Sequence, residues 1–330
     1  MLSLTSFDTG PFRRQRKTMT EAGVSRRESK LGGGGSIPGA EGQAAYTVTM
    51  RDGVPIVLAV PHAGRCYPGD LVAQMRHSDA ARMRLEDRFV DLLAECVARD
   101  TGAPTIVAQA PRAMIDLNRA PDDIDWSMIA GPAPEGSSRL AAGRRARSGL
   151  GLIPRRLPGL GELWRRPLSG EELDGRIEHI HRPYHAMLAR TLERVRDRWG
   201  AVLLIDLHSM PPLGLKRGAE AAPDFVIGDR FGSSCGAPLS AAALEHFAAA
   251  GLRAAHNRPY AGGYALDRHC APARGLHAMQ IEVCRSTYLD AQLAEPAPGM
   301  IAVASVLTAL VRRLAEELTG AGGHLAQAAE

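Results

Sequence analysis

The stretch Val202-Leu-Leu-Ile-Asp-Leu-His-Ser209 begins with four apolar residues and then becomes polar. A short apolar run of this kind is typical of a strand buried on both faces, as in a sheet covered by helices. Polar residues that follow such a strand lie at its carboxyl end, where ligands bind in open α/β sheets. The stretch therefore predicts a central strand that carries Asp206 and His208 to a binding crevice.

An apolar run leads directly into reactive side chains at three further places in the chain. They are Val57-Leu-Ala-Val60 before His62, Met114-Ile-Asp-Leu117 before Asn118 and Arg119, and Met279-Gln-Ile281 before Glu282. Because the carboxyl ends of parallel strands meet at one edge of a sheet, we expect these side chains to gather around one crevice with His208. That crevice would hold two histidines, a carboxylate and an Asn–Arg pair.

From Tyr46 onward, short apolar segments alternate with longer amphipathic ones. We expect strands over residues 54–60, 104–110, 114–117, 201–207, 224–227 and 278–283, and helices over residues 84–100, 170–199, 239–250 and 299–318. Ser169 and Glu172 predict a capping box at the start of the second helix. The alternation of strands and helices predicts a three-layer α/β fold.

The first 45 residues differ in composition from the rest of the chain. Residues 1–45 contain basic residues, serine, threonine and a glycine run but no apolar period. We expect a tail that is disordered or that results from a misassigned start codon, since Met19 is also available. Residues 46–330 are expected to form a single α/β domain. Within it, residues 131–168 are rich in glycine, proline and arginine, and they predict a long loop that is functional or mobile.

Composition narrows the class of protein. With 45% hydrophobic and 23% charged residues, the chain is typical of a globular protein. Its longest apolar run, residues 300–311, is too short for a membrane span, which takes about 20 residues. The five cysteines include no Cys-x-x-Cys pair and predict no disulfide framework, which favours a reducing, cytoplasmic location. We therefore expect no membrane partner.

The net charge of +4 reflects an excess of arginine, much of it near the start of the chain and between residues 139 and 166. Basic patches can bind nucleic acid, but these contain neither interleaved aromatic residues nor a recognition motif. We expect them to lie in solvated loops. The expected partner is a small anionic substrate, not a nucleic acid.

The residue types around the predicted crevice suit metal-assisted hydrolysis. A catalytic zinc ion takes three ligands from histidine and carboxylate side chains. His62 and His208 can provide two, and Glu86 or Asp87 can provide the third. Glu282 can act as the base that takes a proton from water. Residue types and spacing alone support this site and a set of hydrogen-bonded structural histidines equally.

Arg119 presents a planar, two-pronged donor that suits a substrate carboxylate, and Asn118 can help to orient it. A second group of polar residues shares one helical face and consists of Glu178, His181 and His185. Pro183 lies between its members, and the helix is expected at the surface. Both features favour a structural role for this second group.

Seven motifs follow one another along the chain: Val60-Pro-His-Ala-Gly-Arg65, Glu86-Asp-Arg-Phe-Val-Asp91, Asp116-Leu-Asn-Arg119, Arg182-Pro-Tyr-His185, Leu203-Leu-Ile-Asp-Leu-His-Ser209, Gly262-Gly-Tyr264 and His277-Ala-Met-Gln-Ile-Glu282. Together they resemble the N-formylglutamate amidohydrolase (N-formylglutamate deformylase) family, over residues 54–318. The resemblance implies a mixed sheet flanked by helices. Such a phosphorylase/hydrolase-like fold is similar to that of zinc carboxypeptidases and aspartoacylase-like deacylases.

Carried over position by position, the resemblance implies one zinc ion per chain, held by His62, Asp87 and His208. Asp87 is preferred to Glu86 because the family pattern centres on the aspartate. Glu282 would be the general base, and the carboxylate clamp would consist of Asn118 and Arg119. The His-x-x-Glu spacing of carboxypeptidases is absent because position 65 is arginine, and Ala63 stands where the family often has serine, which removes a hydroxyl near the metal.

The implied reaction is hydrolysis of N-formyl-L-glutamate to formate and L-glutamate, a step of histidine degradation, with Arg65, Arg268 or His269 stabilising the oxyanion. One alternative is a zinc hydrolase of the same fold that acts on another N-acyl amino acid or a C-terminal peptide bond. Residues 131–168 would then set the size of the pocket. The second alternative is a non-catalytic protein that binds an anion or a nucleic acid. Glu282 makes this alternative less favoured, because a binding protein needs no general base at a strand end.

Overall fold

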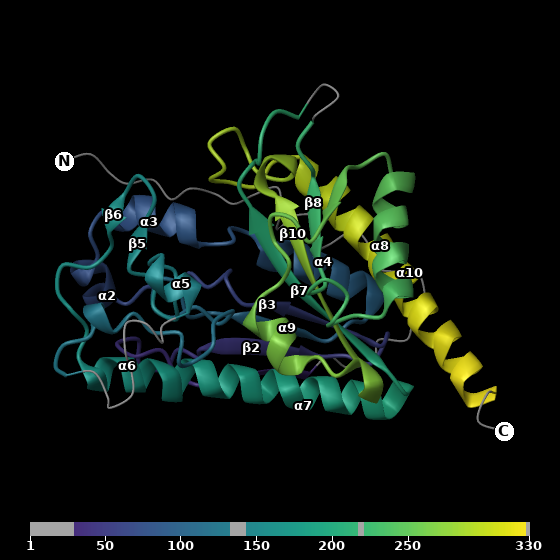
Figure 1. The fold of residues 1–330 in the computed structure, drawn as a ribbon, viewed down its shortest axis with the longest axis horizontal. Coiled ribbons are helices and arrows are strands. Elements are labelled where there is room, and N and C mark those ends of the chain that lie inside the picture. Colours follow the sequence, from purple (N-terminus) through teal and green to yellow (C-terminus); the bar gives the residue numbers. More distant parts are fainter. Residues whose placement is uncertain (1–29, 133–142, 217–220, 328–330) are drawn as a thin grey trace, which may run out of the picture.

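One eight-stranded mixed sheet organises the residues that the computed structural model describes, which are 30–132, 143–216 and 221–327 (Figure 1). The strand order is β1-β2-β4-β3-β7-β10-β8-β9. The strands are β1 (Lys30–Gly34), β2 (Tyr46–Met50), β3 (Ile56–Val60), β4 (Thr105–Ala108), β7 (Val202–Met210), β8 (Phe225–Gly228), β9 (Ala254–His256) and β10 (Leu276–Cys284). The four central strands β4, β3, β7 and β10 are parallel, whereas β2 and β8 pair antiparallel with β4 and β10.

Helices cover both faces of the sheet (Figure 1). On one face lie α4 (Val90–Thr101), α8 (Ala237–Ala249) and α10 (Gly299–Gln327), and along the other lie α6 (Gly170–Arg176) and α7 (Arg182–Trp199). The shorter helices are α2 (Gly69–Gln74), α3 (Ser78–Leu85), α5 (Arg144–Arg147) and α9 (Tyr264–His269). This arrangement confirms the predicted three-layer α/β fold with a mixed sheet.

Alternate residues of the central strands enter two separate cores. In β3, Ile56, Leu58 and Val60 pack with the α4–α8–α10 layer, while Val57 and Ala59 pack with the α7 layer. This alternation is the ordinary geometry of a strand, in which successive side chains point to opposite faces of the sheet. All residues of β3 and β7 are buried, so their continuous apolar runs pack against helices on both faces of the sheet.

The helix expected over residues 84–100 is interrupted. α3 ends at Leu85 and α4 begins at Val90, and Phe89 between them has a left-handed backbone with φ of 59°. The backbone N–H of Asp87 donates to the carbonyl oxygen of His62 at 2.9 Å. The interruption therefore attaches Asp87 to the loop that follows β3.

Residues 114–117, expected as a strand, form turns instead. The N–H of Met114 donates to the carbonyl oxygen of Pro111, and the N–H of Asp116 donates to that of Leu152. The prediction of a strand here was wrong because the carbonyl of Pro111 and the segment around Leu152 satisfy these backbone groups in a turn. β1, β2 and β9 were not predicted.

The long helical segment predicted over residues 170–199 is present as three consecutive parts. α6 begins at the predicted capping box, in which the Ser169 hydroxyl accepts from the Glu172 N–H and the Glu172 carboxylate accepts from the Ser169 N–H. A π-helical turn, Ile177–His181, then joins α6 to α7. Pro183 does not break the helix, because it lies in the first turn of α7, where a missing backbone N–H is tolerated.

Two predicted boundaries need correction. Residues 30–45 belong to the fold, because β1 pairs with β2 and both Ile37 and Ala45 are buried, so the expectation of a tail over residues 1–45 is wrong for residues 30–45. Residues 1–29 lie outside the described residues. The loop expected over residues 131–168 contains α5 and a two-stranded sheet, β5 (Arg156–Leu157) with β6 (Gly161–Glu162), in the part that the structure describes. None of the described helices is long and apolar enough to cross a membrane.

Candidate active site

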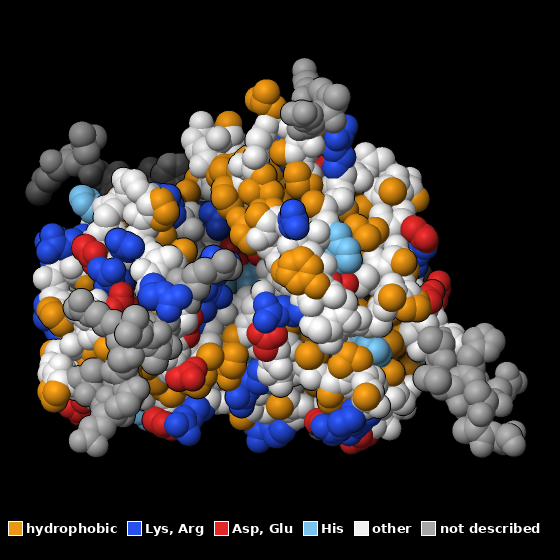
Figure 2. All heavy atoms as spheres, in the orientation of Figure 1, with side chains coloured by type: hydrophobic (Ala, Val, Ile, Leu, Met, Phe, Trp, Pro, Cys, Tyr) orange, Lys and Arg blue, Asp and Glu red, His pale blue; other side chains and the backbone are white. Residues whose placement is uncertain are grey.

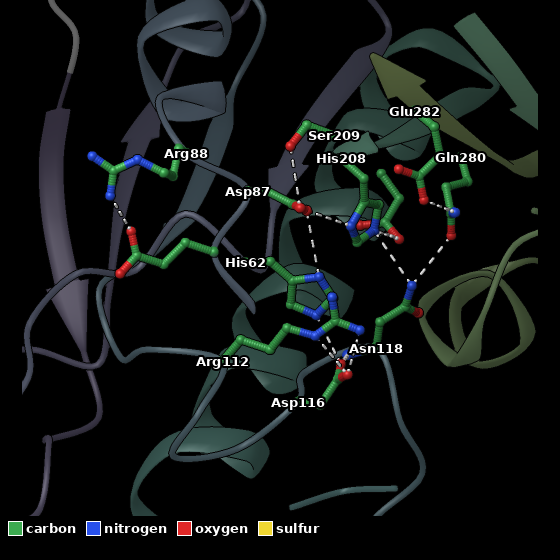
Figure 3. Close-up of polar contacts among 12 residues, drawn as sticks. His62, Asp87, Arg88, Arg112, Asp116, Asn118, His208, Ser209, Gln280 and Glu282 are labelled. Atoms are coloured by element: carbon green, nitrogen blue, oxygen red, sulfur yellow. Dashed lines mark hydrogen bonds and ion pairs between the residues drawn. The ribbon is translucent and has the colours of Figure 1, made fainter. Parts of the chain in front are cut away.

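Three parallel strands bring the predicted reactive side chains together. His62 follows β3, while His208 and Glu282 lie near the ends of β7 and β10 and are paired in register. All three side chains are buried and point into one cavity of about 230 Å³. The strand-end pattern in the sequence therefore corresponds to one site, shown in Figure 3.

His62, Asp87 and His208 form the group that could hold a metal ion. One possible ligand atom from each residue lies within 4.8 Å of the others, and all three residues are buried. The Oδ2 atom of Asp87 is 3.0 Å from His208 Nδ1 and 3.5 Å from His62 Nδ1. Glu86 points away and pairs with Arg88 at 2.9 Å, so Asp87 is the carboxylate that faces the two histidines.

A carboxylate contacts each of the two histidines, and Figure 3 shows the one beside His62. His62 Nε2 is 2.7 Å from Asp116 Oδ1, and His208 Nε2 is 2.8 Å from Asp206 Oδ2. Donation from Nε2 to these carboxylates leaves Nδ1 of each ring directed toward Asp87, and the buried Nδ1 of His62 has no hydrogen-bond partner among the described residues. Carboxylates orient metal-binding histidines in this way, so the residues present fit a metal ion.

Neighbouring side chains influence the ionisation of Asp87 and His208. Burial opposes ionisation of Asp87, but the hydrogen bond from His208 and the neighbouring His62 ring outweigh it and hold the pKa of that carboxyl well below its usual value. Burial likewise opposes a charge on His208, yet the neighbouring Asp206 and Asp87 raise the pKa of its imidazole well above the usual value. A cation bound to this ring would oppose its protonation, because a metal-binding imidazole must be neutral.

Glu282 is a further buried carboxylate that lines the same cavity. Gln280 Nε2 donates to its Oε1 at 2.9 Å. Burial is the largest influence on Glu282 and, with the negative charge of Asp87, it exceeds the opposing effect of His208 and raises the pKa to about 7. A carboxyl with a pKa near neutrality can both accept and return a proton.

Arg112 is a site residue that the sequence analysis missed. It lines the cavity and donates to Asp116 Oδ2 from both Nε and a terminal nitrogen at 2.9 Å. Because Asp116 also contacts His62, Arg112 is fixed against the carboxylate that orients the His62 ring. The only sequence feature that points to Arg112 is its position four residues before Asp116. That spacing indicates a contact only once the turn between the two residues is known.

Asn118 and Arg119 also line the cavity. The Asn118 side chain donates to Gln280 Oε1 at 3.2 Å and accepts from the Ala265 N–H at 3.0 Å. Arg119 donates to the carbonyl oxygens of Leu150 and Asn118. Within the described part of the chain, Arg119 has no ion pair with a carboxylate, so its charge is available to a ligand.

The three predicted oxyanion donors lie elsewhere. Arg65 forms a two-pronged ion pair with Asp91 at 3.0 and 2.6 Å, and exposed Arg268 donates to the Tyr264 hydroxyl. His269 is buried against His185. None of the three lines the cavity, because each is held by its own partner.

A second, outer cavity of about 720 Å³ adjoins the first and shares Asn118, Arg119 and Arg145 with it. Its other walls include Arg230, Phe231 and Arg258. Figure 2 shows basic side chains around the hollow in the middle of this face. The candidate site therefore adjoins a larger space whose lining contains four arginines and three aspartates.

Comparisons with known proteins agree with this geometry. The model of the N-formylglutamate amidohydrolase family matches residues 54–289. An N-formylglutamate deformylase of Pseudomonas putida is 33% identical over 241 residues, which are 72% of this chain and 82% of the relative. One from Pseudomonas aeruginosa is 29% identical over 276 residues, 82% of this chain and 95% of the relative.

Solved structures give the same result. The crystal structure of an N-formylglutamate amidohydrolase from Ralstonia eutropha JMP134 has a TM-score of 0.74 and 33% identity, covering 83% of this chain and 98% of that one. A gene product of Agrobacterium tumefaciens has a TM-score of 0.60 at 18% identity, covering 82% and 93%, and is similar in fold.

Proposed function

The chain belongs to the N-formylglutamate amidohydrolase family, and on that premise we propose that it hydrolyses the formyl amide of N-formyl-L-glutamate to formate and L-glutamate. The observation that carries the proposal is one cavity that contains a metal-binding group, a buried carboxyl with a pKa near neutrality and arginines without carboxylate partners. The relatives named above as N-formylglutamate deformylases support this substrate.

We propose one zinc ion as the cofactor, held by His62, Asp87 and His208. Two histidines and a carboxylate form a common ligand set for catalytic zinc. Such an ion, when bound, polarises a carbonyl and makes a water molecule more acidic. Asp116 and Asp206 keep the two imidazoles in the orientation that this requires.

Glu282 is the proposed general base. It accepts a proton from the attacking water and returns that proton to the nitrogen of the leaving glutamate. Hydrogen bonding to Gln280 fixes the carboxylate, and burial brings its pKa to about 7, which suits a group that must both take and give a proton. Arg112, half-buried and fixed by Asp116, is the arginine of the cavity that we assign to the developing oxyanion.

Two further arginines match the two carboxylates of the substrate. Arg119 contacts carbonyl oxygens only, and no hydrogen bond or ion pair joins the Arg145 guanidinium to the described residues. Burial and the nearby charges of Arg112 and Arg145 lower the pKa of Arg119, against the opposing effect of Asp116. Like charges held this close favour binding of a dianion.

A second candidate substrate class follows from the outer cavity. Its volume of about 720 Å³ lies within the range of about 300–1,000 Å³ that is typical of sites for larger ligands. A longer N-acyl amino acid, or a peptide with a C-terminal carboxylate, could extend into it from the same reaction centre.

The test combines metal analysis with product release. We expect about one zinc ion per chain and chelator-sensitive release of formate and glutamate from N-formylglutamate. N-acetylglutamate and longer N-acylglutamates test the second candidate, and release from these alone would replace the first. Bound zinc without release from any of them would contradict the proposed substrate, and absence of metal would contradict the proposed site.

Two variants test whether Arg119 and Arg145 bind the two carboxylates of the substrate. Arg145→Ala should raise KM for N-formylglutamate about tenfold and have a smaller effect on N-formylglutamine, which lacks the second carboxylate. Arg119→Lys should weaken binding of both substrates, because a point charge cannot replace the planar fork. Equal effects of Arg145→Ala on the two substrates would assign the second carboxylate to another residue.

A further inference from the structure

Three buried histidines lie behind the reaction cavity and have no part in the chemistry proposed above. His181 ends the π-helical turn, His185 lies on the first turn of α7, and His269 ends α9. The rings of His181 and His185 are 4.4 Å apart between centroids, and those of His185 and His269 are 5.2 Å apart. We refer to these three residues as the histidine cluster.

The histidine cluster holds the backbone on both sides of Asn118. His185 Nε2 donates to the carbonyl oxygen of Leu117 at 2.9 Å, and His181 Nε2 donates to that of Arg119 at 2.9 Å. The two rings are one helical turn apart, which matches the spacing of the two carbonyls. Main-chain atoms immediately before and after Asn118 are thus attached to one helical face.

His269 extends these contacts to α9. His185 Nδ1 and His269 Nε2 are 2.9 Å apart, which is hydrogen-bond distance, and the two ring planes differ by only 19°. Since His185 uses its Nε2 proton for Leu117, its Nδ1 accepts and His269 donates. These partners therefore assign a proton to Nε2 in both rings.

The other end of α9 contacts the Asn118 side chain. The N–H of Ala265 donates to Asn118 Oδ1, and a Cβ atom on Gly263 would lie 2.5 Å from that same oxygen. Asn118 is therefore enclosed, with its backbone held from α7 and its side chain held from the start of α9. His269 connects these two helices.

Neutral imidazoles are required for this arrangement. A second proton on His185 would face the N–H of His269 and remove the bond between the rings. Burial, together with the positive charge of Arg268, lowers the pKa of His269 to about 3, and burial also lowers the pKa of His181 and His185. The three rings thus stay uncharged at neutral pH, and the hydrogen bonds described above depend on which nitrogen of each ring carries the proton.

We propose that the histidine cluster consists of positioning residues, which set the backbone of Leu117–Arg119 and thereby aim the Asn118 and Arg119 side chains at the substrate. This inference rests on the proposed role of Arg119 in binding a substrate carboxylate. Displacement of a binding group by about 1 Å can cost up to a hundredfold in rate or affinity. The effect of the cluster should therefore appear in substrate binding more than in the proton transfers of Glu282.

The first experiment uses three variants of the zinc-loaded protein. His185→Leu, which removes the donor to Leu117, should raise KM for N-formylglutamate about tenfold or more, with a smaller change in kcat and unchanged zinc content. His185→Gln, which keeps a donor at the Nε2 position, should restore most of the KM. His246→Leu is the matched control, because His246 Nε2 also donates to a carbonyl, that of Val306, between α8 and α10.

His181→Leu and His181→Gln should repeat this pattern through Arg119. An unchanged KM in both leucine variants of an active enzyme would overturn the proposal. So would equal effects of the leucine and glutamine variants, or an increase in KM of similar size in His246→Leu.

A second measurement is independent of the substrate. Nitrogen-15 NMR of histidine-labelled protein at neutral pH should show His181, His185 and His269 as neutral rings protonated at Nε2. A ring protonated at Nδ1, or a charged ring, would overturn the proposal. If the wild-type protein does not act on N-formylglutamate, the proposed function fails, while the NMR result still decides the state of the histidine cluster.

Discussion

Glu282 differs from the metal-binding group in what its substitution should change. Its carboxylate hydrogen-bonds to Gln280 and lies outside the group of His62, Asp87 and His208. We expect Glu282→Gln to lower kcat about 10²–10⁴-fold, the usual contribution of a general base, while zinc content stays at the wild-type level. Turnover at the wild-type rate, measured by formate release, would remove Glu282 from the mechanism.

Asp206 should control metal affinity without touching the metal. Its contact with His208 Nε2 orients the ring and increases its basicity. We expect Asp206→Asn to weaken metal binding about 10–100-fold, measured by competition with a chromophoric chelator. Asp229→Asn is the matched control, since Asp229 accepts from His256 Nε2 at 2.9 Å away from the metal-binding group. Equal affinities of the wild-type and Asp206→Asn proteins would contradict this role.

Individual site residues were predictable to different degrees. His62, His208 and Glu282 follow apolar runs, so a general rule about strand ends was sufficient to group them. The choice of Asp87 over Glu86 depended on family resemblance, because adjacent carboxylates cannot be distinguished by residue type. Arg112 was missed because its importance comes from a contact with Asp116, and contacts made through a turn leave no periodic signal.

The capping box at the start of α6 gives a prediction for a single helix. Ser169→Ala removes the acceptor for the Glu172 N–H and should lower the free energy of unfolding by about 1 kcal/mol. Ser305→Ala is the control, because exposed Ser305 lies within α10 and its hydroxyl bonds only to the carbonyl of Ile301. Urea unfolding followed by circular dichroism measures both, and equal midpoints for the two variants would contradict the capping role.

The same box predicts a dependence of stability on pH. Hydrogen bonds from the Arg166 side chain, and then from the Ser169 N–H, lower the pKa of Glu172 from 4.5 to about 2. A lowered carboxyl pKa stabilises the folded state above the unfolded value, so this contribution is complete above about pH 4.5 and is lost as the pH falls toward 2. The stability difference between wild type and Glu172→Gln should therefore shrink between pH 6 and pH 3. A constant difference would contradict it.

Sequence periodicity identified helices and buried strands better than their interruptions. The helix expected over residues 84–100 has apolar spacing on both sides of Asp87, but the hydrogen bond from Asp87 N–H to the His62 carbonyl breaks it. Residues 114–117 are apolar enough for a strand, yet the adjacent carbonyl of Pro111 and the distant one of Leu152 hold them in turns. Both failures lie beside the candidate active site, where long-range contacts override local preference.

Stability of the entire protein should depend on the two cores either side of the sheet. Leu310 of α10 is 0% exposed and packs in the core shared with α4 and α8. We expect Leu310→Ala to lower the free energy of unfolding by about 2–5 kcal/mol, the range for large-to-small core substitutions. Ile301→Ala, on the same helix but 68% exposed, should change it by less than about 0.5 kcal/mol. Urea denaturation measures both, and similar losses would contradict this packing.

The interruption between α3 and α4 has a thermodynamic consequence for the metal. It presents Asp87 to His208, a residue 121 positions away in the sequence, so the ligand set exists only when sheet and helices are assembled. An ion that binds only the folded chain favours folding by mass action, by about 2.7 kcal/mol at a free concentration one hundred times its dissociation constant. Availability of the ion would then regulate not only turnover but also how long each copy of the enzyme survives proteolysis.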